Sequence, residues 1–331
     1  MGAVDYQGLA EKSIQGVILS REEVLGVLTA PADDLQRLLQ AALYVREHFW
    51  GRKVHLHMLV NARSGLCPED CHYCSQSAVS KAPISKYSLL PRARLLEGAY
   101  RAKAARAVRY CIVTSGRAPS NRDVDALAAI VREIRERVEI NICVCLGLMT
   151  EGQARRLRDA GVERVNHNLN TSRRFYPSIC TTHTYDDRVR TVENVRRAGL
   201  STCCGGIIGM GERDEDVMDL ALSLRALDVA SIPVNFLHPI PGTPLEGRRD
   251  LTSERCLKAL CLFRFVNPTK EIRVAGGREF NLGDRQPLAL YPANSLFVNG
   301  YLTTPGQAAA DTHRMIEAHG FVIDDVVPPL P

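Results

Sequence analysis

Three cysteines in one short stretch are the residues of this chain best suited to metal chemistry. The stretch reads Cys67-Pro68-Glu69-Asp70-Cys71-His72-Tyr73-Cys74, a C-x-x-x-C-x-x-C spacing. Three thiolates this close can hold one cubane iron–sulfur cluster, which ordinarily takes four such ligands. No fourth cysteine lies nearby in the sequence, so one iron would stay open for a small ligand. A structural zinc site is the alternative, but zinc sites usually close with paired cysteines or histidines, and His72 is poorly placed between two ligands.

The same spacing resembles that of the radical S-adenosylmethionine (SAM) enzymes. This resemblance implies a [4Fe-4S] cluster held by Cys67, Cys71 and Cys74, whose open iron chelates the amino and carboxylate groups of SAM. Reduction of that cluster cleaves SAM to a 5'-deoxyadenosyl radical, so the difficult chemistry belongs to the cofactor. We therefore expect no catalytic acid or base among the side chains.

The composition of the 331 residues narrows the class of protein. Forty-two basic and 37 acidic residues give a net charge of only +5, so we expect no nucleic-acid partner. No secretion signal and no apolar run of ~18 residues is present, so we expect no membrane association either. Eleven cysteines without a secretion signal indicate a reducing, cytoplasmic location and metal binding rather than disulfides.

Short apolar runs alternate with amphipathic stretches from Val54 onward, which predicts an α/β fold, a (β/α)8 TIM-type barrel. The predicted strands cover residues 54–61, 109–116, 140–147, 162–170, 200–209, 231–238, 271–277 and 294–300. The predicted helices cover 92–106, 121–137, 150–160, 185–198, 213–227, 252–266, 283–290 and 306–319. An open doubly wound sheet is the alternative, but no dinucleotide-type glycine loop follows the first strand.

We divide the chain into three parts on this pattern. Residues 1–52 form an N-terminal helical extension, in which Ser20-Arg-Glu-Glu predicts a capping box. Residues 53–320 form the radical SAM barrel, and residues 321–331 a loose C-terminal tail. Barrel active sites form at the C-terminal ends of the strands, so the cysteine loop after the first strand lies at the barrel mouth.

Polar side chains recur at alternate positions of the predicted strands, and alternate positions share one face. A barrel interior is normally filled by Val, Ile and Leu, and buried polar groups are costly unless they hold something. We therefore predict a second metal cluster inside the barrel, with Cys204 pointing away from it. The side chains predicted to face inward are Cys111, Val113, Ser115, Cys143, Cys145, Asn166, Asn168, Asn170, Cys203, Asn235 and Arg273.

Further motifs follow the cysteine loop in a fixed order. They are Arg109-Tyr-Cys111, Asn166-His-Asn-Leu-Asn170-Thr-Ser, Cys203-Cys-Gly-Gly-Ile-Ile-Gly209, Ser231-Ile-Pro-Val-Asn235, Gly242-Thr-Pro-Leu, Glu271-Ile-Arg273, Gly277-Arg278-Glu279 and Thr303-Thr304-Pro305. Together they resemble the biotin synthase family. The resemblance implies a sulfurtransferase that converts dethiobiotin to biotin, in which the radical abstracts hydrogen atoms and an auxiliary iron–sulfur cluster donates the sulfur. It also implies a reductant protein such as flavodoxin or ferredoxin, and a homodimer.

The resemblance further implies the ligands of the auxiliary cluster. Cys111, Cys143, Cys203 and Arg273 match the ligands of a [2Fe-2S] cluster. Many members of the family carry Thr where this chain has Cys145; if Cys145 also ligates, the cluster could be a larger [4Fe-5S] type. A carboxylate clamp is the alternative role for Arg273.

Contacts to SAM and to the substrate are implied in the same way. For SAM the matching residues are Tyr73, Ser115, Asn168, Asn170, Arg188 and Gly209, although better-known members carry Asp where this chain has Asn170. For dethiobiotin they are Asn168 and Asn235 at the ureido ring and Thr303 and Thr304 at the carboxylate tail. The alternatives are a solvated surface role for Arg188 and a helix N-cap for the two threonines.

Some residues and functions stay outside this assignment. We assign Cys180, Cys204, Cys256 and Cys261 to the core or the surface. A hydrogenase-maturation enzyme of similar sequence, and a cluster-binding protein without catalysis, are the alternative functions.

Overall fold

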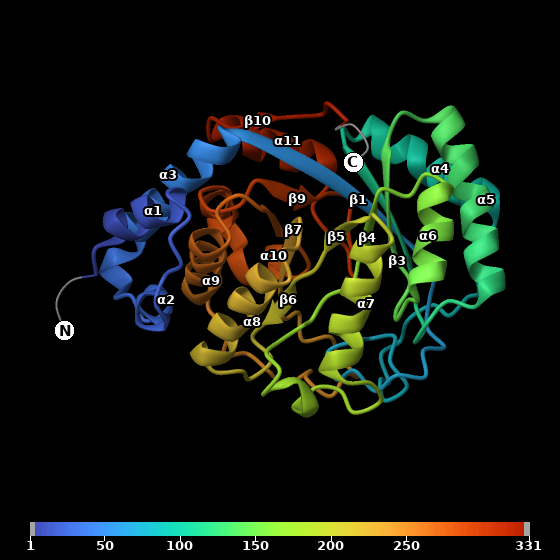
Figure 1. The fold of residues 1–331 in the computed structure, drawn as a ribbon, viewed down its shortest axis with the longest axis horizontal. Helices are drawn as coiled ribbons and strands as arrows, with labels where there is room; N and C mark the ends of the chain where they lie inside the picture. The colour runs from blue at the N-terminus through green and yellow to red at the C-terminus, as the bar shows by residue number, and fades with distance from the viewer. Residues whose placement is uncertain (1–3, 328–331) are drawn as a thin grey trace.

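Eight strand positions close into a parallel barrel in the computed structural model, which describes residues 4–327 (Figure 1). The strands are β1 (Lys53–Arg63), β2 (Arg109–Thr114), β3 (Asn141–Cys145), β4 (Arg164–Asn166), β5 (Ser201–Cys203), β6 (Gly206–Ile208), β7 (Ser231–Phe236), β8 (Glu271–Val274) and β9 (Ser295–Phe297). β1 pairs with both β2 and β9, which closes the sheet. β5 and β6 share the fifth position, both pairing with β7. The predicted barrel is confirmed.

Helices follow the strands and surround the barrel (Figure 1). They are α4 (Arg92–Ala104), α5 (Asn121–Arg137), α6 (Glu151–Asp159), α7 (Tyr185–Arg197), α8 (Asp214–Ala226), α9 (Ser253–Val266), α10 (Arg278–Leu282) and α11 (Ala309–Ala318). The helix predicted over 283–290 is present, but it is not an α-helix. That segment is the 3-10 helix η3 (Gly283–Leu290), because Pro287 inside it cannot donate an α-helical hydrogen bond.

The chain before β1 is helical and packs against the side of the barrel. It contains α1 (Tyr6–Ile14), α2 (Arg21–Leu28), the 3-10 helix η1 (Ala32–Asp34) and α3 (Leu35–Trp50). The capping box at Ser20 is confirmed, with Glu23 completing it. All three α-helices contact α9, as Figure 1 shows at the left of the molecule. Ser13 Oγ donates a hydrogen bond to the Phe265 carbonyl at 2.9 Å, which fixes α1 on α9.

The segment expected to be a loose tail is ordered at its start. β10 (Val322–Ile323) pairs with Lys53 and Val54 of β1, so the prediction was wrong for these residues. Asp324 adds an ion pair to Lys53 at 3.0 Å. Residues 328–331, also predicted to be loose, lie outside the described part of the chain. No helix within residues 4–327 has the length and apolar character needed to cross a bilayer.

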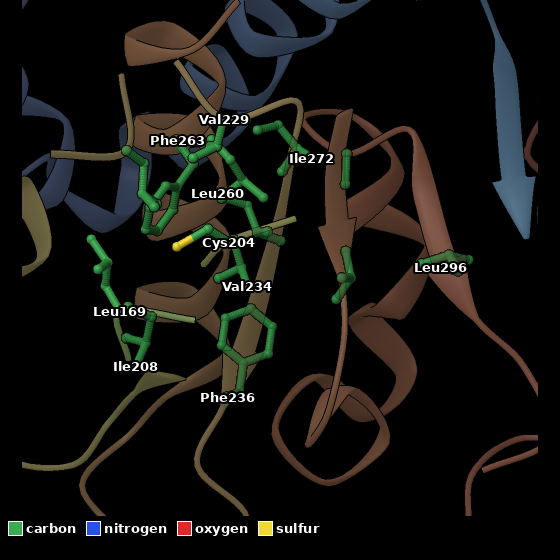
Figure 2. Packing of buried hydrophobic residues seen from close by; sticks show 14 of the residues in the cluster. Leu169, Cys204, Ile208, Val229, Val234, Phe236, Leu260, Phe263, Ile272 and Leu296 are labelled. Carbon is green, nitrogen blue, oxygen red and sulfur yellow. The ribbon is translucent and has the colours of Figure 1, made fainter. Parts of the chain in front are cut away.

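The apolar core lies between the strands and the surrounding helices. Figure 2 shows Val234 and Ile272 of adjacent strands packed towards Leu260 and Phe263 of α9. Cys204 lies in this layer, fully buried, so it faces away from the lumen as predicted. Burying one such aliphatic or aromatic side chain stabilises the fold by roughly 1.5–3 kcal/mol. With the apolar residues on the outer faces of the strands, the inner faces are free to carry polar groups.

Candidate active site

The loop that carries the first three cysteines leaves the C-terminal end of β1 and is held by specific contacts. Gln76 accepts a hydrogen bond from the Gly65 amide at 2.9 Å, and Ser115 donates to the Gly65 carbonyl at 2.6 Å. The Cys74 amide donates to the Cys71 carbonyl at 3.1 Å, which closes a turn between two of the cysteines. The loop therefore presents its thiols from a defined backbone.

The thiols of this loop fit a positively charged iron–sulfur group. Cys71 is buried, and Cys67 and Cys74 are half-buried. Burial raises the pKa of Cys74 to about 11. A hydrogen bond with Cys180, together with burial, raises the pKa of Cys71. Such thiols release their protons when a metal centre binds, because the metal replaces the proton as the charge partner of the thiolate.

A cavity of about 290 Å³ occupies the lumen next to this loop. Cys74 and Tyr73 line it from the loop, and residues of all eight strand positions line it from the barrel. The structure thus brings together most of the predicted site. The predicted residues in the lining are Tyr73, Cys74, Cys111, Val113, Cys143, Cys145, Asn166, Asn168, Asn235, Arg273, Thr303 and Thr304.

Four further cysteines gather at the inner faces of β2, β3 and β5. Cys111 and Cys143 are register partners on neighbouring strands, and Cys145 lies two residues further along β3. A hydrogen bond donated to Cys111, together with burial, raises the pKa of Cys143. Burial raises the pKa of Cys145 to about 12. Cys203 lies outside the cavity lining but receives a hydrogen bond from Arg273 Nη1, with a nitrogen–sulfur distance of 3.5 Å.

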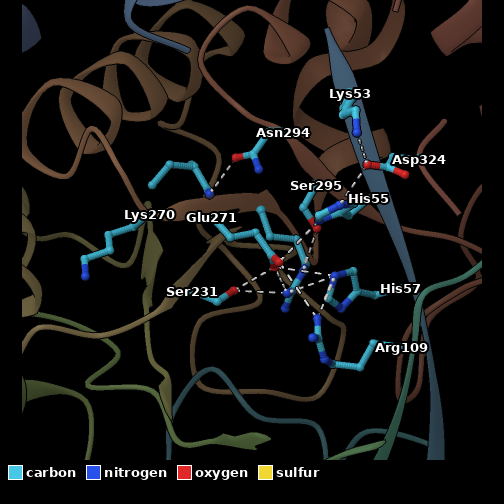
Figure 3. Close-up of polar contacts among 12 residues, drawn as sticks. Lys53, His55, His57, Arg109, Ser231, Lys270, Glu271, Asn294, Ser295 and Asp324 are labelled. Carbon is cyan, nitrogen blue, oxygen red and sulfur yellow. Dashed lines mark hydrogen bonds and ion pairs between the residues drawn. The ribbon is translucent and has the colours of Figure 1, made fainter. Parts of the chain in front are cut away.

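Arg273 is fixed by a buried group of charged and polar residues, called the polar layer below; Figure 3 shows five of its members, namely His57, Arg109, Ser231, Glu271 and Ser295. Its Nε donates to Ser295 Oγ at 3.0 Å, and its Nη2 donates to Ser231 Oγ at 3.0 Å and contacts the Glu271 carboxylate. Only Nη1 is directed at a thiol. The members of the polar layer are His57, Arg109, Glu163, Arg164, Ser231, Glu271, Arg273 and Ser295.

Electrostatics inside the polar layer keep its central pair ionised. Burial alone would raise the pKa of Glu271, but the nearby cations Arg273 and Arg164 lower it well below the usual range. Burial alone would lower the pKa of Arg273, but Glu271 and the thiols raise it. Arg273 therefore carries its charge and pairs with the Glu271 carboxylate, while one nitrogen faces Cys203.

Of the residues expected around SAM, Tyr73 and Asn168 line the cavity, whereas Asn170 and Arg188 lie behind them and contact them by hydrogen bonds. Tyr73 lines the cavity, and its hydroxyl accepts a hydrogen bond from Asn170 at 2.6 Å. Arg188 Nη1 donates to the Asn168 carbonyl at 2.8 Å, and its Nε contacts the Tyr176 hydroxyl. The alternative of a solvated Arg188 was therefore wrong: its guanidinium is turned into the protein.

The remaining two SAM candidates do not line the cavity. Ser115 is buried, with its hydroxyl bonded to the loop of the first three cysteines. Gly209 has a φ of +101°, a conformation that favours glycine, and its amide donates to Glu212 at 2.7 Å. It lines a separate depression with Gly211 and Arg255.

The residues expected around the substrate all line the cavity. Asn235 uses both ends of its amide: it accepts from the Gly276 amide and donates to the Gly206 carbonyl, both at 3.0 Å. Asn168 Oδ1 accepts from Asn166 and from the Gly205 amide. The helix N-cap alternative for Thr303 and Thr304 was wrong, because α11 has Ala308 at its N-cap position.

Several residues around the site escaped the sequence interpretation. The aromatic wall of the cavity, with Phe236, His238, Phe297 and Tyr301, was not predicted. Phe297 could have been predicted from strand alternation, because it lies two residues after the inward-facing Ser295. Cys180, assigned to the core or the surface, is buried, and its sulfur lies 3.7 Å from that of Cys71. Its neighbour was not predictable, because 109 residues separate the two cysteines.

Comparisons with known proteins cover almost the whole chain. The radical SAM superfamily model matches residues 63–224, and the model of the biotin and thiamin synthesis associated domain matches residues 233–322. Biotin synthase of Bacillus subtilis (strain 168) is 55% identical over 321 residues, which cover 97% of this chain and 96% of the relative. Biotin synthase of Geobacillus kaustophilus (strain HTA426) is 55% identical over 316 residues, covering 96% and 95%.

Solved structures share the fold at low identity. Methylornithine synthase (PylB) superposes with a TM-score of 0.84 at 21% identity, covering 96% of this chain and 97% of that one. The hydrogenase maturase HydG of Carboxydothermus hydrogenoformans gives 0.81 at 17% identity, covering 97% and 79%. At these identities the likeness concerns the barrel architecture alone.

Proposed function

Because the chain belongs to the biotin synthase family of radical SAM enzymes, we infer that it converts dethiobiotin to biotin by sulfur insertion. When bound, the [4Fe-4S] cluster with SAM supplies a 5'-deoxyadenosyl radical, and an auxiliary iron–sulfur cluster supplies the sulfur. One observation carries the inference. The loop with Cys74 and the strand thiols Cys111, Cys143 and Cys145 open onto the same cavity, with Arg273 beside them.

The protein's own contribution at the first site is to hold and orient. Cys67, Cys71 and Cys74 would bind the [4Fe-4S] cluster. Tyr73 would lie along the adenine with its hydroxyl fixed by Asn170, and Arg188 would meet the methionyl carboxylate, for which a guanidinium fork is suited. Arg188 Nη1 donates to the carbonyl of Asn168, which lines the cavity, so the guanidinium lies next to the proposed SAM site. Asn168 and Asn170 would contact the ribose, Ser115 the methionyl amine and the Gly209 backbone the adenine side.

At the second site, we assign the auxiliary cluster to Cys111, Cys143, Cys203 and Arg273, as a [2Fe-2S] centre. Arg273 Nη1 supports this assignment, because it is the nitrogen directed at Cys203 while the polar layer holds the other two.

A four-cysteine centre of the [4Fe-5S] type, with Cys145 as a ligand, is the second candidate. It is favoured by the Cys145 thiol in the cavity lining and by the ionised Arg273, since a protonated guanidinium has no lone pair for iron. Iron and sulfide counts in anaerobically purified protein distinguish the two: about six iron atoms per chain for [2Fe-2S] and about eight for [4Fe-5S], given a full [4Fe-4S] cluster. If the auxiliary cluster is [2Fe-2S], Cys145→Thr should leave the iron count unchanged. If it is [4Fe-5S], the same variant should lower the iron count.

Two amides and two hydroxyls are suited to dethiobiotin. A urea group needs both a donor and an acceptor, and an amide side chain offers both. Asn235 Oδ1 keeps a second lone pair for a ureido N–H, and the Asn168 amide nitrogen, which has no hydrogen-bond partner within residues 4–327, can donate to the ureido carbonyl. Thr303 and Thr304 would meet the carboxylate tail, with Thr303 held by Ser75 at 2.7 Å.

The organisation around the site follows from the same proposal. Residues 1–52 would form a helical extension and 53–320 the barrel unit, to which β10 adds its pairing with β1. Radical SAM enzymes need a reductant, which we propose to be a protein such as flavodoxin or ferredoxin. A homodimer and a cytoplasmic location complete the proposal.

The deciding experiment is an anaerobic reaction with reductant, SAM and dethiobiotin, followed by mass spectrometry. We expect both 5'-deoxyadenosine and biotin. Deoxyadenosine without biotin would point to a radical SAM enzyme with another substrate. Absence of both products would point to a cluster-binding protein without catalysis.

A further inference from the structure

Cys180 and His183 lie directly behind the cysteine loop and take no part in the function proposed above. The segment that carries them is clamped to the loop: the His72 amide donates to the Ile179 carbonyl at 3.0 Å, and Thr182 Oγ1 donates to Glu69 at 2.7 Å. Cys180 is 2% exposed and His183 6% exposed. The Cys180 sulfur lies 3.7 Å from Cys71 Sγ and 3.3 Å from His183 Nδ1.

The direction of the hydrogen bonds in this cluster follows from Arg188. A guanidinium can only donate, and Arg188 Nη2 lies 2.7 Å from His183 Nε2, so this ring nitrogen is the acceptor and has no proton. The imidazole proton is therefore on Nδ1, where it faces both Glu69 and Cys180. In the absence of a cluster Cys71 donates its thiol proton to Cys180; once Cys71 has lost that proton to bind a cluster, Cys180 is the only S–H donor between the two sulfurs.

The same assignment argues against a separate metal ion at this place. Cys71, Cys180 and His183 have donor atoms within 4.8 Å of one another, which could suit a tetrahedral cation. Coordination through Nδ1 would require the proton to move to Nε2, where it would oppose the Arg188 N–H. A hydrogen-bond relay that ends on Cys71 satisfies all four side chains, whereas a metal ion does not.

We propose that Cys180 is a positioning residue that acts through Cys71, donating an S–H hydrogen bond to the sulfur of this cluster ligand. The inference rests on the proposed role of Cys71 in the [4Fe-4S] cluster. A ligating Cys71 carries no proton, so the proton between the two sulfurs can only belong to Cys180. Hydrogen bonds to ligand sulfurs set the reduction potential of such clusters, because they withdraw charge and stabilise the reduced state. The relay Arg188–His183–Cys180 would therefore ease reduction of the cluster.

The test is a redox titration of the anaerobic, cluster-loaded protein followed by electron paramagnetic resonance. The signal that changes when SAM is added identifies the relevant cluster. We expect Cys180→Ala to make reduction about three- to tenfold less favourable, a fall of ~30–59 mV for a one-electron couple. Cys180→Ser keeps a donor and should stay near the parent. Cys261→Ala, a fully buried cysteine of α9 away from the site, is the matched control and should not shift the potential.

A potential of Cys180→Ala equal to that of the parent would overturn the inference. If this variant loses iron, Cys180→Thr and Cys180→Val give the same contrast, because the two side chains share a shape and differ in the hydroxyl donor. Equal potentials for that pair would also contradict the proposal. A parent protein without any SAM-sensitive signal would contradict the assigned cluster itself, which is a failure of the proposed function rather than of Cys180.

Discussion

The two cysteine sets of this chain are built on different scaffolds. The loop set, Cys67, Cys71 and Cys74, lies within eight residues of irregular backbone between β1 and α4. The strand set, Cys111, Cys143, Cys145 and Cys203, is spread over three strands of a closed barrel. Turn hydrogen bonds and the segment around Cys180 hold the first set, whereas sheet register and the polar layer hold the second.

This difference teaches which part of the site can adapt. A loop can adjust its turns around a cofactor at modest cost, because few long-range contacts change. A strand residue cannot move without breaking parallel pairings on both sides. We therefore expect the strand set to hold the sulfur-donating auxiliary cluster in a fixed position. We expect the loop set to be the part whose backbone adjusts when SAM binds.

The largest effect should come from breaking the loop set. Cys71→Ala removes one of three ligands, and the neighbouring thiol of Cys180 lies 3.7 Å from the position of the lost sulfur. We expect SAM cleavage to fall to background, so that neither 5'-deoxyadenosine nor biotin is detected by mass spectrometry. Cys256→Ala, in the core of α9, is the matched control and should retain both products. Deoxyadenosine formation at the parent rate in Cys71→Ala would contradict the assignment.

Breaking the strand set should separate the two products. Cys203→Ala removes a ligand of the auxiliary centre but leaves the loop untouched. We expect SAM cleavage to continue at a reduced level while biotin falls by at least about 100-fold, because the sulfur source is lost. Measuring both products in one reaction gives the ratio directly. Biotin formed by this variant at the normal rate would exclude Cys203 from the auxiliary site.

The polar layer should make the strand set sensitive to a single charge. Glu271→Gln keeps the shape of the side chain but leaves Arg273 and the neighbouring arginines without their central carboxylate. Breaking a buried ion pair in this way costs about 3–5 kcal/mol. Urea unfolding of the cluster-free protein measures this loss. Glu97→Gln, which removes an exposed pair with Arg94 at 3.0 Å, should cost no more than about 1 kcal/mol. Similar losses for the two variants would mean that the polar layer is not a stabilising unit.

Much of the site could be predicted from the alternation of inward and outward side chains along the strands. The same rule explains which site residues were predicted and which were not. It placed Cys111, Cys143 and Arg273 on inner faces, where the structure has them. The same alternation, carried two residues earlier on β2 and β8, would have found Arg109 and Glu271. His57 likewise lies two residues before Leu59, which lines the cavity. Arg109 and Glu271 stood in the quoted motifs but were given no role, because the inward-facing set was chosen for possible ligands and not for the charges that hold them.

Contacts between distant loops could not be predicted by any local rule. The meeting of Cys180 with Cys71, and of Thr303 with Ser75, depends on where two loops end after the barrel closes. The barrel itself was predictable because its alternation of strands and helices repeats eight times. Pro287 indicated from the sequence that the helix over 283–290 would be interrupted. It did not indicate that a separate helix, α10, would form before that segment.

The last comparison is between the thiol pKa values of one cysteine from each set. In the cluster-free protein, the pKa of Cys74 is raised to about 11 and that of Cys145 to about 12, both above the ~8.5 of an unfolded chain. The folded state therefore holds these protons more tightly. The stability they contribute is complete below the unfolded pKa and is lost as the pH rises through the folded pKa.

Each thiol should contribute ~1.4 kcal/mol of lost stability per pH unit in that window. We expect Cys74→Ser and Cys145→Ser each to flatten the decline in urea midpoint of the reduced, cluster-free protein between pH 9 and 11. Above pH 11 only Cys145→Ser should still differ from the parent, because Cys74 has by then ionised in the folded state as well. If neither serine variant flattens the decline, the thiols are not buried as described. If only Cys74→Ser flattens the decline, the thiol of the loop set is more strongly shielded from ionisation than the thiol of the strand set. That result would reverse the proposed contrast between an adaptable loop and a rigid set of strands.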